Sequence, residues 1–140
     1  MLYRRLPGKA RPAAAAAEMA VLAIPLTFLF VIGIDYARVF NPYLTVTNCA
    51  RSGALYGSQD AAHAADAAGI QAAALADAGD LSPPPGVTSA TSTDASGVTY
   101  LDVTVTWTFN TVTGFPGLPT SLNLTRTVRM RVAPPTPPGP

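Results

Sequence analysis

An almost uninterrupted apolar stretch runs from Ala13 to Ile34 and is long enough to cross a lipid bilayer. As an α-helix this stretch would extend about 33 Å, and a hydrocarbon core is about 30 Å thick. It carries one acid, Glu18, near its N-terminal end. An ionised carboxylate within a bilayer costs at least about 2 kcal/mol unless a partner neutralises it. We therefore predict a transmembrane helix whose acid needs a positive partner. The alternative is that Glu18 lies at the interface, where the helix dipole favours an acid near the N-terminus.

Basic residues are concentrated before the apolar stretch. No acid lies among them, and they are Arg4, Arg5, Lys9 and Arg11. Because basic flanks stay in the cytoplasm, the sequence predicts a cytoplasmic N-terminus, with the residues after about 35 on the outer side of the membrane. A secretory signal peptide is the alternative. The length of the apolar core, the position of Glu18 and the lack of a small-x-small cleavage site before Asp35 argue against it.

Composition excludes several classes of function. Only 12% of the residues are charged and the formal net charge is +1, so the chain lacks the basic surface of a nucleic-acid-binding protein. One cysteine and one histidine argue against an intrachain disulfide and a structural zinc site. The sequence shows no nucleophile–base pair, phosphate loop or paired carboxylates. It therefore predicts a protein that is not an enzyme and that takes no metal, cofactor or small-molecule substrate.

The helical pattern continues past the membrane, and we predict one helix over residues 14–57 with its span at about 14–34. Pro25 and Pro42 lie inside this helix and are expected to bend it, because proline lacks the N–H that the helix ladder uses. Asp35 and Arg38 are three residues apart just beyond the span, so they are expected to pair on the helix surface.

Small residues form the C-terminal end of a stripe that follows the same helix. The stripe includes Val39, Tyr43 and Val46, and its small residues are Ala50, Gly53, Ala54 and Gly57. Small side chains let a packed element approach the helix backbone closely. Cys49 lies beside them, and we interpret it as a packed residue, with an intermolecular disulfide as the alternative.

An alanine-rich segment, residues 58–80, predicts a second, short helix with Ser58 or Asp60 at its start and Gly79 at its end. Asp60, His63 and Asp66 follow one another at intervals of three, which resembles the spacing of metal ligands on a helix. The 100° step of the helix aligns all three only loosely, so we favour a solvated polar stripe.

From residue 81 to 133 the apolar period changes to two, which predicts three antiparallel strands at about 87–93, 99–109 and 122–132. Arg126 interrupts the apolar row of the last strand. Arg129 and Arg131 belong to its polar face, where they are solvated or pair with acids of a neighbour. A sheet with one apolar face needs a cover, and the long helix is the obvious one. We predict an α+β fold, with this sheet packed on the helix and a proline-rich tail at 134–140.

Three pieces in this order resemble the TadE-like pseudopilins of tight-adherence (Flp, type IVc) pili. They are the basic leader, residues 1–13, then AAAAAEMAVLAIPLTFLFVIGIDYARVF, then TNCARSGALYG. The matching positions are Glu18, Pro25, Gly33, Asp35, Arg38, Asn48, Arg51, Gly53 and Ala54. The segments VTVTWTF and TRTVRMRV are similar to that family's closing strands. The resemblance implies a minor pseudopilin of the bacterial inner membrane that assembles a Tad pilus by helix packing and contributes to adhesion. Its implied partners are a prepilin peptidase and other pilins or pseudopilins.

The resemblance also implies a cleavage site between Ala13 and Ala14. In the family's signal a glycine precedes the cut and a glutamate lies five residues after it, and here Ala13 stands in place of that glycine. Cleavage would create an amine on Ala14, one helical turn before Glu18, that can neutralise the acid of its own or an adjacent subunit. The alternative is an unprocessed, membrane-anchored periplasmic binding or adhesion module.

Overall fold

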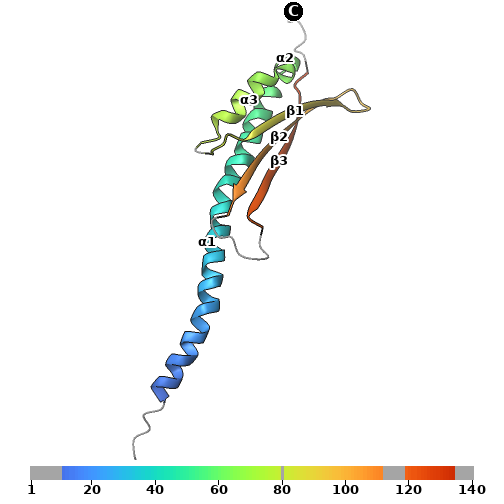
Figure 1. Cartoon of the computed structure of the whole chain (residues 1–140). Coiled ribbons are helices and arrows are strands. Elements are labelled where there is room, and N and C mark those ends of the chain that lie inside the picture. Colours follow the sequence, from blue (N-terminus) through green and yellow to red (C-terminus); the bar gives the residue numbers. More distant parts are fainter. Residues whose placement is uncertain (1–10, 80, 112–118, 135–140) are drawn as a thin grey trace, which may run out of the picture.

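The computed structural model describes residues 11–79, 81–111 and 119–134, and it shows a long helix with a small sheet along one end (Figure 1). Most of the predicted leader and proline-rich tail lie outside the described residues. The elements in chain order are α1 (Arg11–Gly57), α2 (Ala61–Ala65), α3 (Ala67–Ala76), β1 (Gly86–Thr93), β2 (Thr99–Asn110) and β3 (Ser121–Arg131).

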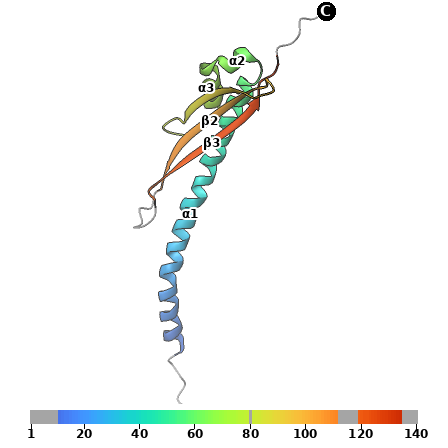
Figure 2. The ribbon, with the colours of Figure 1, turned by 90° about the vertical axis from the view of Figure 1, so that its right-hand side faces the viewer.

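The helix α1 runs without a break through both internal prolines, Pro25 and Pro42. Figure 2 shows α1 as a gently curved rod whose N-terminal half stands clear of every other element. Residues 13–30 are all exposed, and burial along α1 begins only at Val31 and Ile32. The helix therefore has two parts: residues 13–30, which we call the free half, and the part from Val31 onward, which carries the sheet.

The sheet has the order β1-β2-β3, and both strand pairs are antiparallel. The apolar row of β2 faces α1, with Leu101, Val103 and Val105 fully buried. The threonines that alternate with them form the opposite face, where Thr104 and Thr127 share a hydrogen bond of 2.8 Å across β2 and β3. These observations confirm the predicted α+β class and the three-stranded antiparallel sheet covered by the long helix.

The alanine-rich segment differs in detail from the single helix that its composition predicts, because α2 ends after five residues and α3 follows at once. Asp66 separates the two helices and accepts a hydrogen bond of 2.9 Å from the backbone N–H of Gly69. A short acidic side chain competes with the helix backbone in this way and begins a new helix more readily than it continues an old one.

The core lies where α1, α3 and β2 meet. Its fully buried members include Val46, Ala50, Ala54, Ile70 and Leu101. The lack of a side chain at Gly57 permits this close packing, because a Cβ there would overlap Leu101 Cδ2 and stand 3.0 Å from Ile70 Cδ1. The small-residue face of α1 is thus filled by elements of the same chain.

Candidate functional site

The free half of α1 is the candidate site, because it is a wholly exposed apolar surface with one acid on it. Within residues 13–30, the large side chains are between 41% and 76% exposed; they are Met19, Val21, Leu22, Ile24, Leu26, Phe28, Leu29 and Phe30. Glu18 is exposed among them, beside Ala17, Val21 and Leu22. In the part of the chain that the structure describes, no side chain forms an ion pair or hydrogen bond with Glu18.

The bond between Ala13 and Ala14 lies in the first turns of α1, which begins at Arg11. Both alanines are exposed on the helix surface. Glu18 is four residues beyond Ala14, so the α-carbons of these residues lie about one turn apart on the same side of the helix. A charge on the nitrogen of Ala14 would therefore stand close to the carboxylate of its own chain.

A second polar feature marks the point where the free half ends. Asp35 is only 6% exposed, although it lies at the edge of an apolar segment. Arg38 Nη1 approaches Asp35 Oδ1 to 3.7 Å, and the Arg38 side chain stays half exposed. A small, mostly apolar pocket adjoins this carboxylate between α1 and the facing ends of β2 and β3. Its lining comprises Ile32, Asp35, Tyr36, Val39, Thr111, Pro119 and Leu122.

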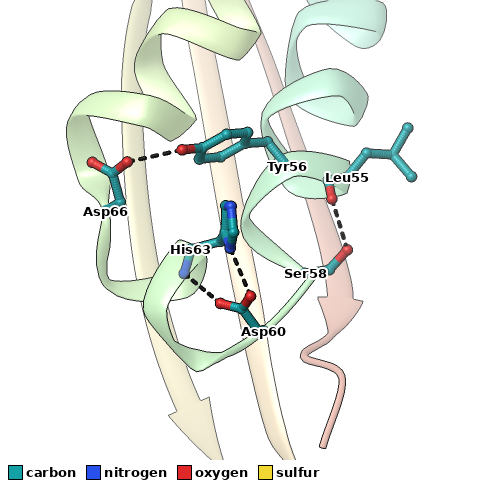
Figure 3. A network of polar contacts seen from close by, with 6 residues as sticks. All are labelled: Leu55, Tyr56, Ser58, Asp60, His63 and Asp66. Carbon is teal, nitrogen blue, oxygen red and sulfur yellow. Dashed lines mark hydrogen bonds and ion pairs between the residues drawn. The ribbon is translucent and has the colours of Figure 1, made fainter. Parts of the chain in front are cut away.

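The polar residues of the alanine-rich segment form a network that shapes the fold (Figure 3). Asp60 caps α2 by accepting hydrogen bonds of 2.8 Å from the backbone N–H of His63 and from its ring Nδ1. Asp66 caps α3 and accepts a 2.9 Å hydrogen bond from the Tyr56 hydroxyl. The backbone bond from His63 lowers the pKa of Asp60, and the bond to Asp66 raises the pKa of the Tyr56 phenol. Asp60 and Asp66 are therefore helix caps, and among the described residues no group of three such ligands could hold a metal ion.

Two arginines have partners that the strand pattern alone did not indicate. Arg129 pairs with Asp102 directly across β2 and β3, through hydrogen bonds of 2.7 and 2.6 Å. Arg126 lies over the ring of Tyr43 on α1, with its central carbon 5.9 Å from the ring centroid. The signal for the first pair was present in the sequence, since both residues alternate with the apolar rows, but strand register was needed to join them.

The comparison with protein families agrees with the geometry of α1. Residues 13–55 match the family model described as TadE-like protein. The matched segment begins at Ala13 and contains Glu18, Asp35 and Arg38. Searches of curated proteins and of solved structures gave no match. Among the described residues, α1 is the one helix long and apolar enough to cross a membrane. Residues 13–55 of this chain are therefore TadE-like, and they lie in a helix that is long and apolar enough to serve as a single membrane anchor.

Proposed function

We propose that this chain is a minor pseudopilin or assembly component of the Tad (Flp, type IVc) pilus, and that it acts by packing its helix against other subunits, without a catalytic step. It resides in the bacterial inner membrane with its N-terminus in the cytoplasm and its sheet on the outer side. A prepilin peptidase removes residues 1–13, and other pilins or pseudopilins are its partners.

The observation that carries this proposal is the exposed position of Glu18 on the free half of α1. No side chain of the described chain covers or pairs with this acid, and its surroundings are apolar. An ionised acid at this depth is costly in lipid, and a positive group on a neighbouring helix removes most of that cost. Glu18 would not stabilise a helix that serves only as an anchor. In a helix that assembles with others, Glu18 can form an ion pair with a positive group of a neighbouring subunit.

The outer half of α1 supports the same proposal. Opposite the buried small-residue face, an exposed row of large apolar side chains continues at intervals of four, namely Tyr36, Phe40 and Leu44, with Leu55 farther along. Tyr36 follows the proposed span of residues 14–34 closely, and Phe40, Leu44 and Leu55 lie farther beyond it. An exposed apolar row on a membrane-proximal helix is typical of a surface that packs against another protein.

Cleavage before Ala14 would supply the positive group. The new amine lies about one turn from Glu18 in the same helix, and subunits staggered along a filament can bring the amine of one to the acid of the next. Pairing between subunits would favour a fixed stagger, because the ion pair forms only at one relative height of the two helices. In this proposal the chain contributes to adhesion through the pilus that it helps to assemble.

The test is the Glu18→Gln variant, which removes the charge with little change of shape. We expect normal insertion into the membrane and loss of pilus assembly, measured by membrane fractionation and by counting pili in electron micrographs. Glu18→Asp is the matched control, because it keeps the charge and should retain assembly. Normal piliation in the Glu18→Gln strain would defeat the charge-pairing proposal.

A second candidate function is an unprocessed, permanently anchored periplasmic binding or adhesion module, and the residue that favours it is Ala13 at the position of the family's glycine. Intact-mass measurement of the membrane-extracted protein, with and without the prepilin peptidase, distinguishes the two. The pseudopilin loses residues 1–13 only when the peptidase is present. A full-length protein in both strains would leave only an uncleaved role.

A further inference from the structure

We propose that the end of the sheet where β2 finishes and β3 begins rests in the headgroup layer of the lipid bilayer, as a second membrane contact beside α1. The described residues of this sheet end are Asn110, Thr111, Pro119, Thr120 and Ser121. The proposal depends on α1 crossing the membrane and holds whether or not the protein enters a pilus.

The first argument is the length of the free half of α1. Residues 13–30 are exposed throughout, and burial begins at Val31. Eighteen helical residues extend about 27 Å, slightly less than the roughly 30 Å of a hydrocarbon core. Any tilt of the helix shortens its projection across the membrane further. No spare length therefore separates the bilayer from the first part of the sheet.

The second argument is the height at which the sheet touches the helix. Thr111, Pro119 and Leu122 line one small pocket together with Ile32 and Asp35 of α1. Figure 1 shows this end of β2 and β3 as the part of the sheet nearest to the free half of α1. Since Ile32 is still within the apolar stretch, the residues that pack beside it lie at the boundary between lipid tails and headgroups.

The third argument is the distribution of charge along the sheet. The sequence from residue 103 to 125 contains no charged residue, and this includes the whole of the sheet end defined above. Four charged residues of the strands and their far turn lie toward the opposite end, namely Asp94, Asp102, Arg129 and Arg131, and Arg126 lies midway along the β2–β3 pair. Desolvation at a bilayer surface is costly for charged groups and mild for hydroxyls and amides that can bond to headgroups. The charge-free end is thus the end that can be placed against lipid.

A second contact would fix the orientation of the sheet as well as its height. The helix alone permits rotation about its own axis and sliding along it, whereas a sheet end resting on the headgroups resists inward sliding. Extraction of the protein from the membrane must then break the contact at the sheet end together with the burial of the helix.

The test uses single-cysteine reporters in the full-length protein, because Cys49 is its one cysteine. In a Cys49→Ala background, Thr120→Cys places an environment-sensitive fluorophore at the proposed contact. Ser96→Cys is the matched control in the exposed turn at the other end of the sheet. Each labelled protein is reconstituted in phosphatidylethanolamine–phosphatidylglycerol vesicles carrying nitroxide either on the headgroup or in the middle of the acyl chain. Circular dichroism verifies the fold, and Asn110→Cys replaces Thr120→Cys if that variant does not fold.

We expect a blue-shifted emission and strong quenching by headgroup nitroxide at position 120, with neither effect at position 96. Water-like emission without quenching at both positions would overturn the proposal. Quenching at position 120 by mid-chain nitroxide in preference to headgroup nitroxide would also overturn it, because the sheet end would then lie within the hydrocarbon. Equal quenching at both positions would show a sheet lying flat on the membrane and would overturn the proposed orientation.

Discussion

Arg126 of β3 lies over the ring of Tyr43 of α1, with its central carbon 5.9 Å from the ring centroid. In the strand register Arg126 is opposite Val105, so it occupies a position on the helix-facing side of the sheet. The side chain is nevertheless exposed. A long basic side chain can cover apolar surface with its stem while its charged head reaches water, and here the head rests on an aromatic face. This contact explains how a charge interrupts an apolar row without being buried.

The first prediction concerns the contact between Arg126 and Tyr43. A double-mutant cycle with Arg126→Met and Tyr43→Leu should give a coupling free energy of about 0.5 to 1 kcal/mol, as is usual for exposed cation–π pairs. The measurement is chemical unfolding in detergent micelles, followed by the fluorescence of Trp107. Arg131→Met is the control, because Arg131 is an exposed arginine on the same strand. Additive effects of the two substitutions would show that the contact contributes nothing.

The second prediction concerns Gly57. Gly57→Ala should destabilise the sheet-bearing part by about 1 to 3 kcal/mol, the usual cost of overpacking a core. The added methyl group would overlap Leu101 Cδ2 and stand 3.0 Å from Ile70 Cδ1, and both side chains are fully buried. Gly33→Ala is the matched control, because nothing lies within 4 Å of a Cβ at that position. Thermal unfolding of both variants checks the prediction, and equal melting temperatures would contradict it.

Regular patterns in the sequence predicted the main architecture well. The apolar stretch and its continuation predicted a helix over residues 14–57, close to the observed Arg11–Gly57. Strict alternation around Val103 and Val105 predicted the central strand and its buried face. Such patterns predict structure well because the same alternation of buried and exposed positions continues over many residues. Each residue then supports the same assignment of helix or strand.

Single side chains that decide a local structure were harder to predict. In the alanine-rich segment almost every residue suits a helix, and Asp66 is the one sign in the sequence of where α2 ends and α3 begins. At that boundary the carboxylate of Asp66 accepts hydrogen bonds from the backbone N–H of Gly69 and from the hydroxyl of Tyr56. The burial of Asp35 and the stacking of Arg126 on Tyr43 depend on how the sheet is placed along α1, which no local pattern specifies.

The third prediction is a pH dependence of stability that Asp102 contributes. The two hydrogen bonds from Arg129 hold the pKa of Asp102 below its usual value. An aspartate in the unfolded chain titrates near pH 3.9, so this contribution is complete above about pH 4. It is lost as the pH falls through the lower pKa of the folded protein.

Asp102→Asn should therefore melt below the unsubstituted protein at neutral pH, and the difference should shrink as the pH falls below about 4. Arg129→Gln removes the other partner and should show the same convergence. Asp60 and Asp66 also have lowered pKa values, so all variants still lose stability in acid. A difference in melting temperature that stays constant from neutral to acidic pH would refute the assigned role of this pair.

The fourth prediction is that Cys49 is unreactive in the folded protein. Its side chain is fully buried, and burial, followed by the charge of Asp77, raises the pKa of its thiol. Both steric access and the population of the reactive thiolate are therefore low. A maleimide reagent at neutral pH should label the native protein far more slowly than the protein unfolded in denaturant.

The control for this labelling is the Cys49→Ala, Ser96→Cys variant, whose thiol lies in an exposed turn and should react at once. The same burial predicts that the protein migrates as a monomer on a non-reducing gel, because an intermolecular disulfide would require α1 to separate from the elements that cover Cys49. If native Cys49 reacted as fast as the control thiol, or if a reducible dimer formed, the core between α1 and the sheet would have to open readily, and the sheet could not hold a fixed height on the helix.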